Sequence, residues 1–188
     1  MSTPEIAAAA AAVARGEIVG VPTDTVYGIA ADPWNERAVA TLFELKGRPD
    51  DKPVGLLAAS ASQAAEIADF GPARALTELH WPGALTLVLR PLVVIPDWIG
   101  SASVRAVGVR VPDHDGLRRL LAMTGPLAVT SANRSGESET LDEIGARAIF
   151  GDRVAVFVPG RCPGGVASTV VDATGPDLVV LRAGPVQT

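Results

Sequence analysis

Two cations flank a glycine where a predicted helix ends, and they are the first residues in the chain that could do chemistry. Lys46 and Arg48 stand on either side of Gly47. Cations at the carboxyl end of a helix complement the helix dipole, so a solvated helix end is one interpretation. The other is a polyanion site, with the guanidinium as a planar fork and the ammonium as a point charge. Spacing alone leaves both interpretations open.

Two further arginines stand at the ends of predicted strands. Arg110 lies within the apolar run Val107–Val111, directly before Pro112, and Arg182 precedes Ala183-Gly184-Pro185. A surface strand can carry an arginine, but an arginine at a strand end can also clamp a carboxylate in a pocket. Both interpretations apply to each residue.

Small polar residues occur in two segments that could form turns. Thr130-Ser131-Ala132-Asn133 follows a predicted strand. Such residues build ligand-binding turns or cap the next helix, and the local pattern favours the cap. Pro163-Gly164-Gly165, ahead of Ser168-Thr169, predicts either a hairpin turn or a backbone nest that holds an anion.

The common catalytic signatures are absent from the sequence. It has no P-loop motif and no G-x-G-x-x-G motif. With His80, His114 and Cys162 as its only histidines and cysteine, a zinc site is excluded in practice, and neither histidine lies in a motif typical of a serine triad. Cys162 is interpreted as a bystander. An enzyme with this sequence would therefore work mainly by binding and electrostatics.

The elements that must position these residues follow from the hydrophobic pattern and the turn residues. A first helix is expected with Thr3 as N-cap, Pro4 in its first turn and Gly16 as its stop. The other predicted helices cover residues 35–46, 62–70, 72–81, 115–123 and 141–150, and the predicted strands cover residues 17–21, 53–59, 84–90, 104–111, 127–130, 154–158, 168–172 and 178–182. Because strands and helices alternate irregularly, we expect an α/β fold of the α+β type: a mixed sheet flanked by helices, not a doubly wound parallel sheet.

Composition limits the class of protein. The 188 residues, 48% of them hydrophobic and 20% charged, predict one globular domain over 1–188. The sequence has no apolar run long enough to span a membrane, and its single cysteine suits a reducing compartment, so a soluble cytoplasmic protein is expected. A net charge of −5 and eight aromatic residues argue against a broad nucleic-acid-binding face.

Taken together, these motifs resemble the YrdC-like family of threonylcarbamoyl-AMP synthases. The resemblance rests on ordered motifs from about residue 5 to the end: Val21-Pro22-Thr23-Asp24-Thr25-Val26-Tyr27-Gly28, Lys46-Gly47-Arg48-Pro49, Val109-Arg110-Val111-Pro112, Ser131-Ala132-Asn133, Pro163-Gly164-Gly165, Ser168-Thr169-Val170-Val171-Asp172 and Leu181-Arg182-Ala183-Gly184. It implies a twisted mixed sheet around a large, positively lined cavity. It also implies the short, single-domain form of the family, because the chain ends soon after Arg182.

The implied reaction condenses L-threonine, bicarbonate and ATP to threonylcarbamoyl-AMP and pyrophosphate. A downstream complex then transfers the threonylcarbamoyl group to a tRNA adenosine. The implied catalytic residues are Lys46 and Arg48; the implied ATP-binding residues are Lys46, Arg48, Ser131, Asn133, Ser138 and Arg182; the implied threonine-binding residues are Thr23, Arg110 and Ser168. Mg²⁺ is expected to arrive with ATP and to be held largely by phosphate oxygens and water, with no dedicated metal site.

Two departures from the family pattern qualify individual assignments. The family often has a histidine after K-G-R-P where this chain has Leu57, so no threonine contact is carried over there. After S-x-N-x-S-G the family often continues R-P-S-P-T, whereas this chain has Glu137-Ser138-Glu139-Thr140, which makes Ser138 the weakest nucleotide contact.

Two rival functions remain open. One is a family paralogue with the same cavity and another acceptor. The other is a non-catalytic RNA-binding protein, against which the acidic net charge counts, although a local basic cavity is compatible with a weak tRNA contact.

Overall fold

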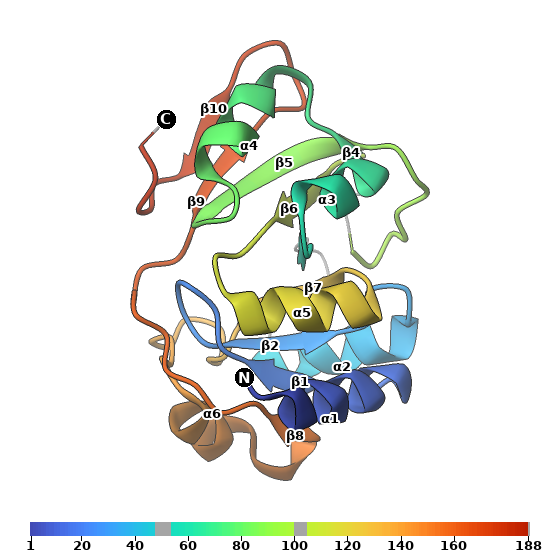
Figure 1. The fold of residues 1–188 in the computed structure, drawn as a ribbon, viewed down its shortest axis with the longest axis vertical. Helices are drawn as coiled ribbons and strands as arrows, with labels where there is room; N and C mark the ends of the chain where they lie inside the picture. Colours follow the sequence, from blue (N-terminus) through green and yellow to red (C-terminus); the bar gives the residue numbers. More distant parts are fainter. Residues whose placement is uncertain (48–53, 100–104, 188) are drawn as a thin grey trace.

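A mixed β-sheet forms the frame of the molecule (Figure 1). The computed structural model describes residues 1–47, 54–99 and 105–187. The strands are β1 (Val19–Val21), β2 (Gly28–Ala31), β3 (Gly55–Leu57), β4 (Ala68–Asp69), β5 (Leu85–Pro91), β6 (Val107–Arg110), β7 (Leu127–Ser131), β8 (Val156–Phe157), β9 (Thr169–Asp172) and β10 (Val179–Arg182). Within these residues their order is β10-β9-β5-β6-β3-β7-β2-β1-β8, with β4 paired to β5. Three neighbouring pairs, β3–β6, β5–β9 and β1–β8, are parallel and the others are antiparallel, so the predicted mixed sheet is confirmed.

Helices cover both faces of the β1–β2–β7 region. The helices are α1 (Thr3–Ala14), α2 (Glu36–Lys46), α3 (Ala61–Ile67), α4 (Arg74–His80), α5 (Asp115–Thr124) and α6 (Glu143–Phe150), with short 3₁₀ turns at Gly71–Ala73 and Gly151–Arg153. Successive residues of a strand point to opposite faces. Ala30 of β2 accordingly joins the apolar cluster of α1 and α5, whereas Ile29 and Ala31 join the cluster that contains α2. Among the described residues, no helix combines the length and apolarity that a membrane span requires.

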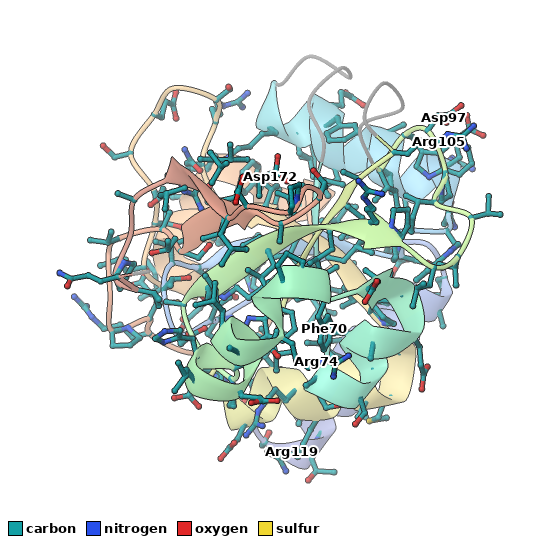
Figure 2. All side chains as sticks on the ribbon, turned by 90° about the horizontal axis from the view of Figure 1, so that it is seen from above. Phe70, Arg74, Asp97, Arg105, Arg119 and Asp172 are labelled. Atoms are coloured by element: carbon teal, nitrogen blue, oxygen red, sulfur yellow. The ribbon has the colours of Figure 1, made fainter. Side chains whose placement is uncertain are left out.

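At the other end of the sheet, α3 and α4 lie against β5 (Figures 1 and 2). Phe70 joins them: its ring meets Trp81 edge to face at 5.5 Å between centroids, and the Arg74 guanidinium lies 5.9 Å above it. Such contacts each add a modest stabilisation to the burial of the rings themselves.

Helix caps determine where the candidate cation turn begins. Asn35 accepts a hydrogen bond from the Ala38 N–H at 3.1 Å, and Gly47 adopts a left-handed φ of 61° that ends α2. Both ends agree with the prediction, and they make Lys46 the last residue of the helix. The first helix differs by one residue, because Ser2 rather than Thr3 is its N-cap and donates its own N–H to Glu5 Oε2 at 2.6 Å.

The sequence pattern missed β2, which lies between β1 and β7 in the sheet. Its residues Gly28–Ala31 are Gly-Ile-Ala-Ala, which have low strand propensity, and all four are buried. Small residues are required there because the sheet is covered on both faces: a Cβ on Gly28 would lie 2.9 Å from Val129 Cγ1. The pattern also continued the 62–70 helix through β4, a two-residue strand that pairs with β5.

Candidate functional site

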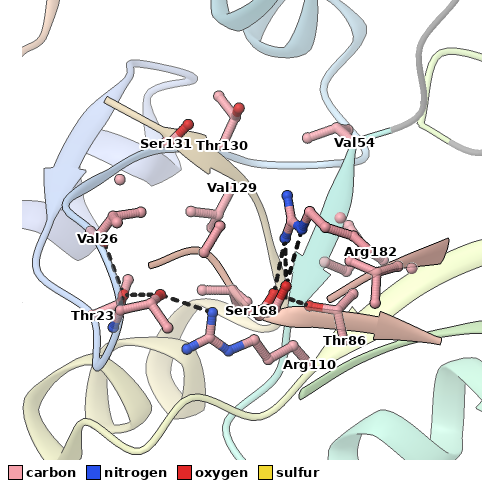
Figure 3. A pocket seen from close by; sticks show the side chains of 18 of the residues that line it. Thr23, Val26, Val54, Thr86, Arg110, Val129, Thr130, Ser131, Ser168 and Arg182 are labelled. Atoms are coloured by element: carbon pink, nitrogen blue, oxygen red, sulfur yellow. Dashed lines mark hydrogen bonds between the residues drawn. The ribbon is translucent and has the colours of Figure 1, made fainter. Parts of the chain in front are cut away.

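A cavity of about 500 Å³ lies against the uncovered face of the sheet (Figure 3). Alternate residues of β5 and β9, such as Thr86, Val88 and Val170, face it and are only half-buried, while their neighbours lie in the core. The loop after β1 and the ends of β7 and β10 complete the wall. The polar and charged residues of the lining are Thr23, Thr25, Thr86, Arg110, Thr130, Ser131, Glu139, Ser168, Asp172 and Arg182.

Lys46 joins the end of α2 to the end of β7. Its Nζ donates to the carbonyl oxygen of Ser131 at 2.8 Å, to Ser131 Oγ at 2.9 Å and to Asn133 Oδ1. Its main-chain oxygen accepts from the Ser135 N–H at 2.8 Å. Lys46 is 7% exposed and Asn133 is 6% exposed, so this cation is built into the wall and is not a solvated helix end.

The segment after β7 is therefore not a helix cap, contrary to the interpretation that its local pattern favours. The next helix, α6, takes Asp142 as its N-cap, which accepts from the Gly145 N–H at 3.0 Å. The Ser131 hydroxyl instead donates to Asn133 Oδ1 at 2.7 Å, and the Asn133 amide donates to two main-chain oxygens, of Arg134 and Glu137. These bonds fix the orientation of both side chains.

Arg110 is held by acceptors from three sides. Its Nε donates to the Gly83 carbonyl at 3.0 Å, its Nη1 to Thr25 Oγ1 at 3.0 Å, and its Nη2 to the Asp24 carboxylate. Burial lowers the pKa of the guanidinium, and the neighbouring Asp24 carboxylate opposes that shift. Arg110 thus lies in a pocket rather than on the surface of its strand, and it lines the cavity.

Thr23 shapes the loop that faces Arg110. Its hydroxyl donates to the Val26 carbonyl at 2.9 Å and lies 2.9 Å from Thr25 Oγ1. The Thr23 N–H donates to the sulfur of Cys162 at 3.3 Å, and burial raises the pKa of that thiol. A protonated, buried thiol agrees with a packing and hydrogen-bonding role for Cys162.

Ser168 and Arg182 lie together in the lining of the cavity (Figure 3). The Arg182 guanidinium donates to the Ser168 carbonyl from Nε at 3.0 Å and from Nη2 at 2.8 Å, and to Ser168 Oγ at 3.2 Å. The Ser168 hydroxyl also lies 2.8 Å from Thr86 Oγ1. The resemblance assigned Ser168 to threonine and Arg182 to the nucleotide, and here the two side chains touch.

The structure brings together most of the residues that the sequence singled out. Thr23, Arg110, Ser131, Ser168 and Arg182 all line the cavity, and Lys46 and Asn133 support its wall through Ser131. Ser138 is exposed and does not line the cavity, whereas its neighbour Glu139 does. Arg48 lies outside the described residues.

The sequence pattern assigned no role to Thr25 or Thr86, which also face the cavity. Thr25 lies in the Val21–Gly28 motif, which could have indicated a place at the site. Thr86 lies in no recognised motif. Only the alternation along its strand, in which its neighbours Leu85 and Leu87 are buried, could have indicated that Thr86 points to the open face.

The chain is similar in sequence to known proteins. Residues 11–184 match the family model Sua5_yciO_yrdC, whose description is "Telomere recombination". A protein of Mycobacterium tuberculosis is 42% identical over 186 residues, which cover 97% of this chain and 85% of the relative. The threonylcarbamoyl-AMP synthase of Bacillus subtilis is 40% identical over 188 residues, which cover 96% of this chain and 54% of the relative.

A solved structure shows the same fold. The crystal structure of P. abyssi Sua5 complexed with L-threonine superimposes with a TM-score of 0.88 at 37% identity, covering 95% of this chain and 54% of that one. The chain therefore spans little more than half the length of the B. subtilis and P. abyssi relatives.

Proposed function

The chain belongs to the Sua5–YciO–YrdC family, and we propose that it is a threonylcarbamoyl-AMP synthase, a nucleotidyltransferase that condenses L-threonine, bicarbonate and ATP. The observation that carries the proposal is one cavity of about 500 Å³ with Arg110 and Thr23 on one wall and Ser131, backed by Lys46, on another. A cavity of this volume is typical of small-molecule sites.

In the proposed reaction the threonine amine forms a carbamate with bicarbonate, with loss of water, and an oxygen of that carbamate attacks the α-phosphorus of ATP. The bond between that phosphorus and its bridging oxygen to the β-phosphate breaks, and pyrophosphate leaves. Lys46 and Arg48 would stabilise the charge that develops on the phosphates, as cations do in other phosphoryl and nucleotidyl transfers. Ser131, Asn133 and Arg182 would orient the nucleotide by hydrogen bonds, whereas the exposed position of Ser138 gives it the weakest support.

On the other wall, Arg110 would receive the threonine carboxylate, with Thr23 and Ser168 beside the amino acid. The relative from P. abyssi was crystallised with L-threonine, which supports an amino-acid substrate for this family fold. Holding the reactants together without a covalent intermediate can lower a barrier by roughly 7–11 kcal/mol, so no nucleophile is needed.

Mg²⁺ would enter with ATP. Among the described residues no group of three or more His, Cys, Asp or Glu side chains could hold a metal ion. We therefore propose that phosphate oxygens and water hold most of the Mg²⁺ coordination sphere. The product would pass to a tRNA-modifying system in the cytoplasm, and residues 1–188 would form a single domain.

Pyrophosphate release by purified protein tests the proposal. We expect release that requires ATP, bicarbonate and L-threonine together and that is slower with L-serine. The Lys46→Ala variant should lose at least a hundredfold in rate because removal of one charge-stabilising donor typically costs that much. ATP binding without any dependence on threonine would point instead to a paralogue with another acceptor.

A further inference from the structure

The Asp24 carboxylate does not line the cavity, but it contacts Arg110, which does. Thr23 and Thr25 line the cavity, but Asp24 between them does not. Its carboxylate accepts from Arg110 Nη2; the side chain of Arg110 is buried, and that of Asp24 is largely buried, with 12% of it exposed. Asp24 therefore acts on the cavity through Arg110.

Three acceptors fix the Arg110 guanidinium in one plane. The Gly83 carbonyl takes the Nε–H, Thr25 Oγ1 takes one N–H of Nη1, and Asp24 takes one N–H of Nη2. A guanidinium has five N–H groups, so Nη1 and Nη2 each carry one more. Guanidinium N–H groups of this kind bind carboxylates through strong, charge-assisted hydrogen bonds.

Asp24 also balances the charge of Arg110. An ionised side chain buried without a partner is strongly unfavourable, and a carboxylate in contact offsets that cost. The pair has no net charge, so Arg110 would attract a ligand through directed N–H groups rather than through an unbalanced positive field. This suits a zwitterionic amino acid better than a polyphosphate.

We propose that Asp24 is a positioning residue for the amino-acid subsite: it orients Arg110 and neutralises its charge so that the remaining N–H groups receive the substrate carboxylate. The proposal rests on threonine being a substrate of this cavity. It predicts that Asp24 governs threonine affinity and leaves ATP affinity unchanged.

Calorimetric titration with L-threonine, and separately with ATP, tests it. In Asp24→Ala the dissociation constant for L-threonine should rise at least tenfold, while that for ATP changes less than twofold. Asp24→Asn keeps an oxygen acceptor and removes only the charge, so it should fold like the wild type and raise the threonine constant about two- to fivefold. The control is Asp113→Ala, which removes an exposed carboxylate three residues beyond Arg110 and should change neither constant.

The outcomes separate this proposal from the proposed function. A wild-type protein that binds ATP but not L-threonine contradicts the function itself. Wild-type threonine affinity in a folded Asp24→Ala or Asp24→Asn variant overturns the positioning role. If threonine and ATP affinity fall by the same factor, together with the melting temperature, the ion pair is only a structural anchor and the proposal is equally wrong.

Discussion

Two arginines reach the same cavity, and they are held in different ways. Arg110 is 6% exposed, paired with a carboxylate and held from three sides. Arg182 is an exposed residue on the edge strand β10, and its guanidinium is held by the two oxygens of Ser168. The same residue type is therefore held in two ways: Arg110 by three different residues in the interior, and the exposed Arg182 by a single residue.

The difference should appear most strongly when each arginine is removed. Arg110→Ala leaves the Asp24 carboxylate buried without its partner, and breaking a buried ion pair typically costs about 3–5 kcal/mol. We expect a loss of this size in the free energy of unfolding, measured with urea, and a loss of threonine-dependent pyrophosphate release. If Arg110→Ala kept wild-type stability, the pair would be less isolated from solvent than its burial indicates.

The wall that holds Arg182 depends on a close approach of the chain to itself. A Cβ on Gly184 would lie 2.4 Å from the Thr169 main-chain nitrogen and 2.6 Å from the Ala167 carbonyl oxygen. Gly184→Ala should therefore push residues 167–169 away and move Ser168, at a cost of about 1–3 kcal/mol, as for other overpacked sites.

Thermal unfolding and the KM for both substrates measure the effect of Gly184→Ala. The control is Gly175→Ala, because a Cβ on Gly175 meets no atom within 4 Å. Equal stability of the two variants would show that the tail after β10 can shift without strain, and that the Arg182 wall is even looser than the contacts suggest.

Removal of Arg182 itself should affect binding more than folding. Exposed charged contacts contribute about 0–1 kcal/mol to stability. We therefore expect Arg182→Ala to unfold within about 1 kcal/mol of the wild type, while the KM for ATP rises about five- to tenfold and the KM for threonine changes less. A larger effect on threonine would assign Arg182 to the amino-acid subsite beside Ser168.

The sequence predicted the cations of both walls but not what holds them. Lys46 was placed correctly at the end of its helix because Asn35 and Gly47 mark the two ends of that helix through local signals, which act within a few residues. The contact of Lys46 with Ser131 joins residues 85 positions apart, and spacing along the chain says nothing about it. Only the resemblance to a family linked the two motifs before the structure did.

The prediction of the fold also succeeded where local signals decide and failed where contacts between distant segments decide. Strands rich in valine and leucine, such as β5 and β10, were recognised from their pattern, whereas β2 was missed because tight packing on both faces selects Gly and Ala. Propensity reports what a residue favours in isolation, and at β2 the tertiary packing decides. Asp24 shows the same limit at the site. Its residue type indicates only a turn, whereas in the fold it pairs with the buried Arg110.

The smallest of these effects is a pH dependence of stability at the start of α5. His114 is the N-cap of α5, and its Nδ1 accepts from the Leu117 N–H at 3.1 Å, which requires that nitrogen to be unprotonated. Burial lowers the pKa of His114, and the positive chain terminus lowers it further, while Asp24 and Asp115 oppose the shift. As pH falls below the ordinary histidine value of about 6.5, the unfolded chain takes up a proton that the folded chain does not, so stability decreases. The loss in the free energy of unfolding should stay below about 1 kcal/mol, as for a single helix cap.

Urea unfolding at pH 7.5 and 5.5 should show a larger decrease in the wild type than in His114→Asn, which keeps a capping acceptor without titrating. Identical decreases in both proteins would place the pH dependence elsewhere in the molecule.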